Sequence, residues 1–262
     1  MDSTLEILPS CIGCGRCVSV CIRGHLTIGD DRKVHETDSA FGCFRCGHCA
    51  AICPKSAIVP RWYVSEVKDI SGSPIGKDDL RRLLSERRSI RWFDRNCTRE
   101  EISEILEAVC YSPTAENSQS VEYAVVEERF DEFMVLLASI LSSHTDEHPR
   151  LKQFVDYVND GQQSRNNPFT WEGRQIIIAF SRLPIDAIIA MEQVDLMASA
   201  MGLGGFHSRW MLKAAEDDME RFMSFFPGIR DDLHPYAVYV IGHPRVRFKH
   251  TVERDERPIH WM

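Results

Sequence analysis

Eight of the ten cysteines in this chain fall in two runs of identical spacing. The runs read CIGCGRCVSVC and CFRCGHCAAICP, and their cysteines are Cys11, Cys14, Cys17 and Cys21, then Cys43, Cys46, Cys49 and Cys53. A thiolate at every third residue can wrap one face of a four-iron cubane and offer three sulfurs to three irons, with the fourth ligand coming from further along the chain. The two runs therefore predict two [4Fe-4S] clusters.

A pair of structural zinc sites is the alternative interpretation. Zinc usually takes two C-x2-C pairs separated by a longer spacer, and two complete four-cysteine runs fit that pattern poorly. Disulfides are disfavoured because cysteines two residues apart are poor partners for each other but good neighbours around a metal. We therefore expect a reducing cytoplasm. The other two cysteines, Cys97 and Cys110, are expected to be free thiols, with Cys110 buried.

Residues 5–60 resemble the bacterial two-cluster ferredoxins, with residues 22–41 as a hairpin and linker between the runs. In those proteins the fourth cysteine of each run serves the other cluster. The resemblance implies one cluster on Cys11, Cys14, Cys17 and Cys53, and a second on Cys43, Cys46, Cys49 and Cys21. One departure is that Ile22, not proline, follows Cys21. Such a module only carries electrons, so another part of the chain must use them.

Composition limits what that other part can be. A chain of 262 residues with 44% hydrophobic residues is long enough for two domains. Its formal net charge of -8 argues against binding nucleic acid. Apolar runs such as IIIAF at 176–180 are too short to span a bilayer, and MDSTLEILPS does not read as a secretory signal. We expect neither a nucleic acid nor a membrane as partner.

The remaining sequence predicts an α+β domain. Gly, Ser and Pro at 68–76 mark a boundary, so we place a ferredoxin-like domain at 1–62, a linker at 63–77 and the larger domain at 78–262. Helices are expected at 77–88, 98–112, 129–143, 150–159, 186–205 and 217–225, and strands at 121–128, 175–181 and 235–242. Thr98 and Glu101 stand at capping-box spacing.

Four motifs in this domain occur in the order seen in the FMN-dependent nitroreductase family: RRSIRWF at 87–93, YSPTAENSQ at 111–119, MASAMGLGG at 197–205 and VIGHPRVRF at 240–248. The resemblance covers about residues 78–262. The whole chain is similar to the branch of that family with a ferredoxin segment. This implies a nitroreductase-like FMN-binding fold preceded by a small bacterial ferredoxin-like domain.

The resemblance also implies which residues contact FMN. Guanidinium groups and hydroxyls suit a phosphate, and the first motif would supply them from Arg87, Arg88, Ser89 and Arg91. The second motif would reach the flavin of another subunit through Pro113, Thr114, Ala115 and Asn117. The third would place Gly204 and Gly205 along the flavin N5 edge, and the C-terminal region would complete the phosphate site with His250 and Arg254, or with Lys249 or Arg247.

Each motif taken alone also has an ordinary structural interpretation: a solvated basic patch, a polar turn, or a glycine that ends a helix. Two departures from the family pattern are visible. Ser120, Val121 and Glu122 follow the second motif, which leaves the substrate side of that loop open, and His250 stands where the family has arginine. The region at 129–172 would build the substrate pocket, in which Phe169 and Trp171 either cover the flavin or lie in a plain surface loop.

No acid–base or nucleophile constellation is present, so no catalytic residue is predicted and the chemistry would be that of the flavin. His207 is expected to be an ordinary core or surface residue. We expect a homodimer in which electrons pass from a low-potential donor, such as reduced ferredoxin, through two clusters to FMN. They would go on to a small acceptor: a nitroaromatic, a quinone or an activated alkene. The alternatives are an electron-carrier or redox-sensing flavoprotein that serves a protein partner, and another flavin reaction such as reductive dehalogenation or flavin fragmentation.

Overall fold

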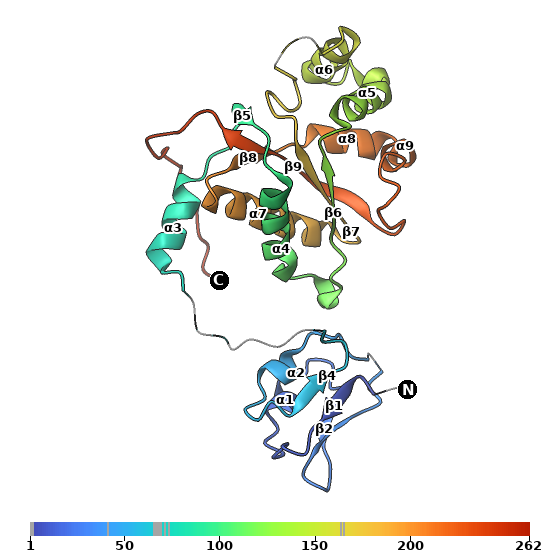
Figure 1. The fold of residues 1–262 in the computed structure, drawn as a ribbon, viewed down its shortest axis with the longest axis vertical. Coiled ribbons are helices and arrows are strands. Elements are labelled where there is room, and N and C mark those ends of the chain that lie inside the picture. Colours follow the sequence, from blue (N-terminus) through green and yellow to red (C-terminus); the bar gives the residue numbers. More distant parts are fainter. Residues whose placement is uncertain are drawn as a thin grey trace. The chain divides into compact units, whose positions relative to one another are not determined.

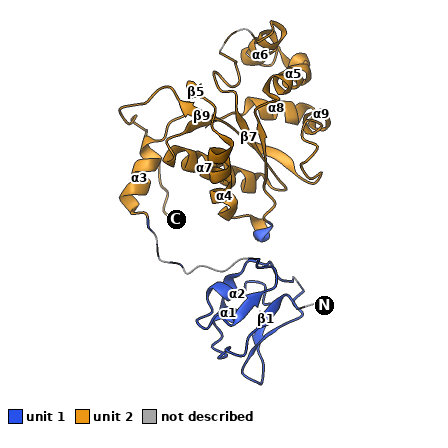
Figure 2. Cartoon of the chain, viewed as in Figure 1, with its two compact units in different colours: residues 1–74, 116–118 blue, residues 75–115, 119–262 orange. Residues whose placement is uncertain are grey.

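The chain divides into two compact units in a computed structural model that describes residues 3–40, 42–64, 70, 72, 74–162, 164 and 166–262 (Figures 1 and 2). The first unit comprises Met1–Pro74 with Glu116–Ser118, and the second Ile75–Ala115 with Gln119–Met262. Much of the linker predicted at 63–77, namely residues 65–69, 71 and 73, lies outside the described residues. Within the described part of the chain, no helix has the length and apolar character needed to cross a membrane.

The described residues of the first unit form two small sheets and two one-turn helices. Strand β1 (Leu5–Ile7) pairs antiparallel with β4 (Ile58–Pro60), and β2 (Leu26–Ile28) pairs antiparallel with β3 (Val34–Glu36), which confirms the hairpin between the cysteine runs. Helices α1 (Arg16–Ser19) and α2 (His48–Ala51) each begin after a glycine with φ of 74°. That left-handed conformation suits glycine, which lacks a Cβ, and it turns the chain sharply inside each cysteine run.

The second unit is built on an antiparallel sheet of order β5-β9-β7-β6, with β8 also paired to β9. Its strands are β5 (Phe93–Arg95), β6 (Glu122–Val126), β7 (Ile176–Ser181), β8 (Gly204–His207) and β9 (His234–Pro244). Its helices are α3 (Lys77–Glu86), α4 (Arg99–Ala108), α5 (Phe130–Leu141), α6 (Pro149–Asn159), α7 (Pro184–Ala200), α8 (Trp210–Asp217) and α9 (Met219–Met223). Short 3-10 turns lie at Val109–Tyr111, Ala115–Asn117 and Ser142–His144.

The sheet separates two hydrophobic cores. Successive side chains of a strand point to opposite faces, so β7, which is buried along its whole length, serves both. Ile176 and Ile178 join the core with α5, α6, α8 and α9, and Ile177 joins the core with α4 and α7 (Figure 1). Complete burial explains why this strand reads as an uninterrupted apolar run instead of an alternating one.

Most predicted elements are confirmed, including the capping box of Thr98 and Glu101 at the start of α4. Two expectations were wrong, namely the end of the long helix and the burial of Cys110, and some elements were not predicted. The long helix α7 ends at Ala200, before the glycines, and Gly204 and Gly205 begin the unpredicted strand β8. Helix α8 was also not predicted. Cys110 is exposed, because α4 ends at Ala108 and the helical periodicity that would have buried this side chain stops there.

Candidate redox sites

The cysteine thiols of the first unit have neighbours from both runs. Burial raises the pKa of the Cys17 thiol, and the negative charges of Cys53 and Cys11 raise it further. Burial likewise raises the pKa of Cys49 to about 11, with contributions from Cys43, Cys46 and Cys21. Each set contains a fourth cysteine from the other run, as crossed ligation requires. The ligand assignment itself stays a prediction.

The spacing of the sulfurs also bears on the choice between zinc and a cluster. Four thiolates about 2.3 Å from one zinc ion would lie about 3.8 Å from one another. Among the described residues, none of the eight cysteines belongs to a group of three ligand atoms within 4.8 Å of one another. Cys21, Cys43, Cys46 and Cys49 instead line one common cavity together with Phe44 and Trp62. Cys21 of the first run therefore lies beside three cysteines of the second run, as the crossed ligand assignment predicts.

Backbone N–H groups reach sulfur at equivalent places in the two halves of the unit. The N–H of His25 donates to Cys21 Sγ at 3.3 Å, and that of Ala57 donates to Cys53 Sγ at 3.2 Å. The N–H of Arg45 donates to Cys43 Sγ at 3.3 Å. Hydrogen bonds to cluster sulfurs help to set the reduction potential, so these donors suit cysteines that carry a cluster.

In the second unit, the first and third motifs meet. Ser89 forms a parallel bridge with Gly205, and the Ile90 N–H donates to the Gly205 carbonyl at 2.8 Å. Both motif glycines are required here. A Cβ on Gly205 would lie 2.1 Å from the Val240 carbonyl oxygen, and one on Gly204 would lie 2.6 Å from Ile90 Cγ1. Strand β8 therefore fits between β9 and the Ser89–Ile90 segment only without side chains at these two positions.

Asp195, on the buried face of α7, organises the start of the first motif. Its side chain is only 1% exposed, and its Oδ2 lies 3.0 Å from Arg87 Nη1 and 3.5 Å from His207 Nε2. The Tyr239 hydroxyl donates to Asp195 Oδ1 at 2.7 Å. Burial, together with the Asp195 charge, raises the pKa of Tyr239 well above its usual value, so the hydroxyl remains a donor. Sequence reasoning missed Asp195, although an acidic residue within an apolar helix was a usable signal.

The other arginines of the first motif are also engaged. Arg91 places its guanidinium over the rings of Trp171 at 4.8 Å and Phe206 at 5.0 Å. Arg88 Nη1 donates to the carbonyls of Ser85 and Arg87, both at 2.7 Å. Ser89 is exposed. The motif therefore presents an exposed hydroxyl beside guanidinium groups that other residues already hold.

The second motif is anchored by another buried carboxylate of α7. Asp186 is 2% exposed, and its Oδ1 accepts from the Ala115 N–H at 3.0 Å. The Thr114 hydroxyl accepts from the Gln119 N–H at 3.0 Å, and Pro113 is exposed. Asn117 has a left-handed backbone, with φ of 52°, and is grouped with the first unit.

The C-terminal residues predicted to complete the phosphate site are not brought to Arg87 and Ser89 by any described contact. His250 and Arg254, with Lys249 and Arg247, lie in a fully exposed segment without helix or strand. Phe169, one candidate for covering the flavin, lies in the core, stacked on Phe154 with ring centroids 3.7 Å apart.

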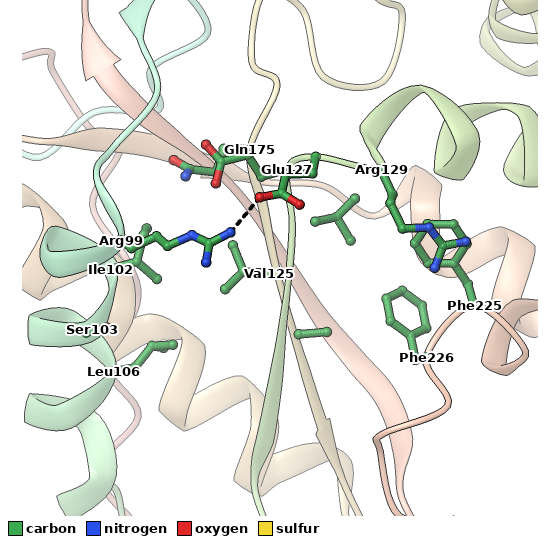
Figure 3. Close-up of a pocket in the computed structure, with 13 residues that line it drawn as sticks. Arg99, Ile102, Ser103, Leu106, Val125, Glu127, Arg129, Gln175, Phe225 and Phe226 are labelled. Carbon is green, nitrogen blue, oxygen red and sulfur yellow. Dashed lines mark hydrogen bonds and ion pairs between the residues drawn. The ribbon is translucent and has the colours of Figure 1, made fainter.

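A separate groove lies over strand β6, between α4 and the phenylalanines that precede β9 (Figure 3). It is lined by Ile102, Leu106, Val125, Phe225 and Phe226, with Arg99 and Arg129 among its polar side chains. Arg99 forms an ion pair with Glu128 at 2.6 Å. None of the predicted FMN-contacting residues lines this groove, so it is not the predicted flavin site.

Comparisons with known proteins match both units. A model of the nitroreductase family matches residues 84–243, and a model of a 4Fe-4S dicluster domain matches residues 10–58. One similar solved structure is a nitroreductase with bound FMN from Desulfitobacterium hafniense DCB-2, at 17% identity and a TM-score of 0.53, covering 69% of this chain and 96% of that one. Another is a nitroreductase with bound FMN from Bacteroides fragilis NCTC 9343, at 16% identity and a TM-score of 0.53, covering 70% and 98%. No curated protein matches. At these identities the structural likeness shows the fold.

Proposed function

The chain belongs to the nitroreductase family and carries an N-terminal 4Fe-4S dicluster domain, and from this premise we propose that it is an iron–sulfur flavoprotein oxidoreductase. Two [4Fe-4S] clusters in the first unit would pass electrons to FMN in the second. The donor would be a low-potential carrier such as reduced ferredoxin. The acceptor would be a nitroaromatic, a quinone or an activated alkene.

The observation that carries this proposal is that Cys21 of the first run lines one cavity with Cys43, Cys46 and Cys49 of the second, in a chain whose second unit has the nitroreductase fold. Iron–sulfur clusters supply single electrons. FMN, when bound, takes up electrons singly and delivers two, often as hydride, and so connects such carriers to a two-electron acceptor. A chain that contains both units could therefore transfer single electrons from the clusters to FMN and two electrons from FMN to an acceptor.

The chain's own residues would bind and orient the flavin. Arg87 would hold the phosphate with its remaining N–H groups while Asp195 fixes Nη1 at 3.0 Å, and Ser89 would add a hydroxyl donor. Because Gly204 and Gly205 carry no side chains, β8 can pack against β9 and Ile90, and its backbone would border the flavin edge. His250 and Arg254 would complete the phosphate site once the C-terminal segment folds over it.

The second motif supports a homodimer as part of the proposal. Pro113, Thr114, Ala115 and Asn117 would contact the flavin of a second copy. Asp186 holds the Ala115 N–H, so the start of this loop is already fixed by its own subunit. A dimer would then contain two flavin sites, each built from both chains.

Anaerobic bleaching of the flavin in the purified, cluster-loaded protein tests the electron route. We expect reduced ferredoxin to bleach it rapidly in wild type and slowly in Cys14→Ser and Cys46→Ser. The control is Cys110→Ser, which changes an exposed cysteine outside both runs and should bleach like wild type. Equal bleaching by NADH or NADPH in every variant would contradict the route through the clusters. Fast bleaching with no turnover of any small acceptor would indicate an electron carrier that serves a protein partner.

A further inference from the structure

Three side chains of different chemical type converge at the start of helix α4. Cys97 precedes the helix, Glu101 lies in its first turn, and His243 lies on strand β9. One sulfur, one carboxylate oxygen and one imidazole nitrogen from these residues all lie within 4.8 Å of one another. The carboxylate and the ring are in direct contact, with His243 Nε2 2.9 Å from Glu101 Oε2. None of the three residues belongs to the cysteine runs or to the set predicted to contact FMN.

These distances and ligand types suit one zinc ion. Zinc lies about 2.3 Å from a thiolate sulfur and about 2.0–2.2 Å from an imidazole nitrogen or a carboxylate oxygen, so the ligand atoms of a tetrahedral site lie about 3.3–3.6 Å apart. Small side-chain movements would bring the three atoms to that spacing. A thiolate also selects zinc over magnesium and calcium, which prefer oxygen ligands. One thiolate and one carboxylate together balance the charge of Zn²⁺.

The backbone of Cys97 is held on both sides by one buried side chain. Gln175 Oε1 accepts from the Cys97 N–H at 2.9 Å, and Gln175 Nε2 donates to the Cys97 carbonyl at 3.1 Å. Gln175 is 1% exposed, and its own carbonyl accepts from the Ile241 N–H of β9 at 3.0 Å. Cys97 is 3% exposed, and its sulfur makes no hydrogen bond to any residue that the structure describes. A buried amide thus orients a cysteine whose sulfur has no partner.

The other two side chains are also oriented, and they leave the group accessible. Glu101 Oε2 accepts from the Thr98 N–H at 2.8 Å within the capping box of α4. The side chains of Glu101 and His243 are 28% and 19% exposed. A metal ion can therefore reach the buried sulfur from solvent, and a water molecule can take the fourth position around it.

The charge around the Cys97 sulfur favours a cation. The charged side chains that act on it are those of Glu101, Arg95 and Glu127, in decreasing order. Two of the three are negative, and the stronger contribution comes from the carboxylate that would itself bind the ion. The surroundings of the sulfur are therefore negative on balance.

A second group of three ligand atoms lacks this property. Within the described part of the chain it comes from Glu192, Asp195 and His207. The Arg87 guanidinium lies 3.0 Å from Asp195 Oδ2, so a positive charge is already present there and would repel a metal ion. The group at α4 is therefore the better metal site of the two.

We propose that Cys97, Glu101 and His243 bind one zinc ion, which connects the start of α4 to strand β9. The ligands would be the Cys97 thiolate, one Glu101 oxygen, His243 Nε2 with the ring hydrogen on Nδ1, and a water molecule. The thiol proton passes to solvent as zinc binds, so the step needs neither an oxidant nor a reductant. The inference does not depend on the clusters or on FMN, and its failure would leave the proposed function untouched.

Zinc K-edge X-ray absorption of the full-length, cluster-loaded protein tests this, after equilibration with Zn²⁺ and removal of unbound ion. We expect about one zinc ion per chain, with one sulfur at about 2.3 Å and nitrogen or oxygen ligands at about 2.0–2.2 Å. A shell of four sulfurs would place the ion in the cysteine runs and would overturn the inference. A shell without sulfur, or protein that retains no zinc, would overturn it as well. This spectrum needs no variant.

Variants assign the ion to its ligands. Cys97→Ala and His243→Gln should each lose the zinc that has a single sulfur ligand, while their iron content stays as in wild type. The matched controls are Cys110→Ala, at an exposed cysteine, and His35→Gln, at an exposed histidine of β3. Both controls should keep the wild-type zinc content. Full zinc content and an unchanged spectrum in Cys97→Ala would contradict the assignment.

Glu101→Gln separates metal binding from helix capping. The amide keeps an oxygen for the Thr98 N–H but removes the negative charge, so α4 should stay capped while zinc binding weakens. Since the loss of an outer-shell partner of a metal ligand already costs about 10–100-fold in affinity, the loss of this ligand's charge should cost at least about tenfold. Competition with a zinc-binding dye measures the change, and an affinity equal to that of wild type would exclude Glu101 as a ligand.

Discussion

Replacing Arg87 by glutamine should destabilise the second unit by about 2–3 kcal/mol, because it leaves the Asp195 carboxylate buried without its arginine. Two charges about 4 Å apart attract by about 4 kcal/mol at an effective dielectric of about 20, and removing one partner of a fully buried pair costs about 3–5 kcal/mol. The Asp195 side chain is 1% exposed but that of Arg87 is 25% exposed. Water therefore screens part of the interaction, which places the expected cost below the fully buried range.

Replacing Asp195 instead of Arg87 should lower the free energy of unfolding by less. Asp195→Asn keeps an oxygen for the Tyr239 hydroxyl, and the partly exposed Arg87 can turn to water, so we expect a loss of about 1 kcal/mol. The matched control is Arg182→Gln. Its pair with Asp232 is shorter, at 2.6 Å, but the two side chains are 56% and 45% exposed, so its loss should remain under about 0.5 kcal/mol.

Urea unfolding of the flavin-free, full-length protein measures these differences. Tryptophan fluorescence follows the second unit, which holds four of the chain's five tryptophans: Trp92, Trp171, Trp210 and Trp261. An Arg182→Gln loss equal to that of Arg87→Gln would refute the reasoning from burial. A larger loss for Asp195→Asn than for Arg87→Gln would refute the claim that the unpaired carboxylate is the costly group.

Three further outcomes are expected. Gly205→Ala should lower the stability of the second unit by about 2–3 kcal/mol, because the new Cβ would lie 2.1 Å from a backbone oxygen. The control is Gly228→Ala, whose Cβ would meet no atom within 4 Å. This control should change the melting temperature little. Thr98→Ala removes a capping box and should cost about 1 kcal/mol in urea unfolding; an unchanged midpoint would contradict that role. Burial raises the pKa of Cys97 from 9.0 to about 12, so the stability it contributes is complete below pH 9 and is lost as the pH rises towards 12. Between about pH 8 and 10, wild type should therefore lose about 1 kcal/mol more unfolding free energy than Cys97→Ala, and parallel losses would refute this.

The sequence predicted those structural features that depend on residues close together in the chain. The cysteine spacing is fixed within each run, and the apolar character of β7 follows from burial on both faces, so both features could be read directly. The capping box of α4 depends on two residues three positions apart. The causes of the cysteine pattern and of the capping box lie within a few residues, and the continuous apolar run of β7 reflects its burial directly, so each could be recognised in the sequence.

Features that depend on distant partners were not predicted. Strand β8 begins with two glycines, which give no side-chain pattern, and its existence follows from pairing with β9. Asp195 looks like an isolated acidic residue until Arg87 and Tyr239 are brought to it from other elements. The position of the C-terminal residues predicted to contact FMN also depends on contacts that the surrounding sequence does not specify.

The crossed grouping of the cysteines has a consequence for how the first unit survives damage. Its hydrophobic core is small, with Leu5, Leu26, Val34, Ala57 and Ile58 among its buried members, so bound metal would supply much of its stability. Because each cluster would take one sulfur from the opposite run, each would act as a cross-link between the two halves. Oxidative loss of one cluster would remove one of these two cross-links and so loosen the cysteine runs that hold the other cluster. The two clusters should therefore be lost together, as a single cooperative failure.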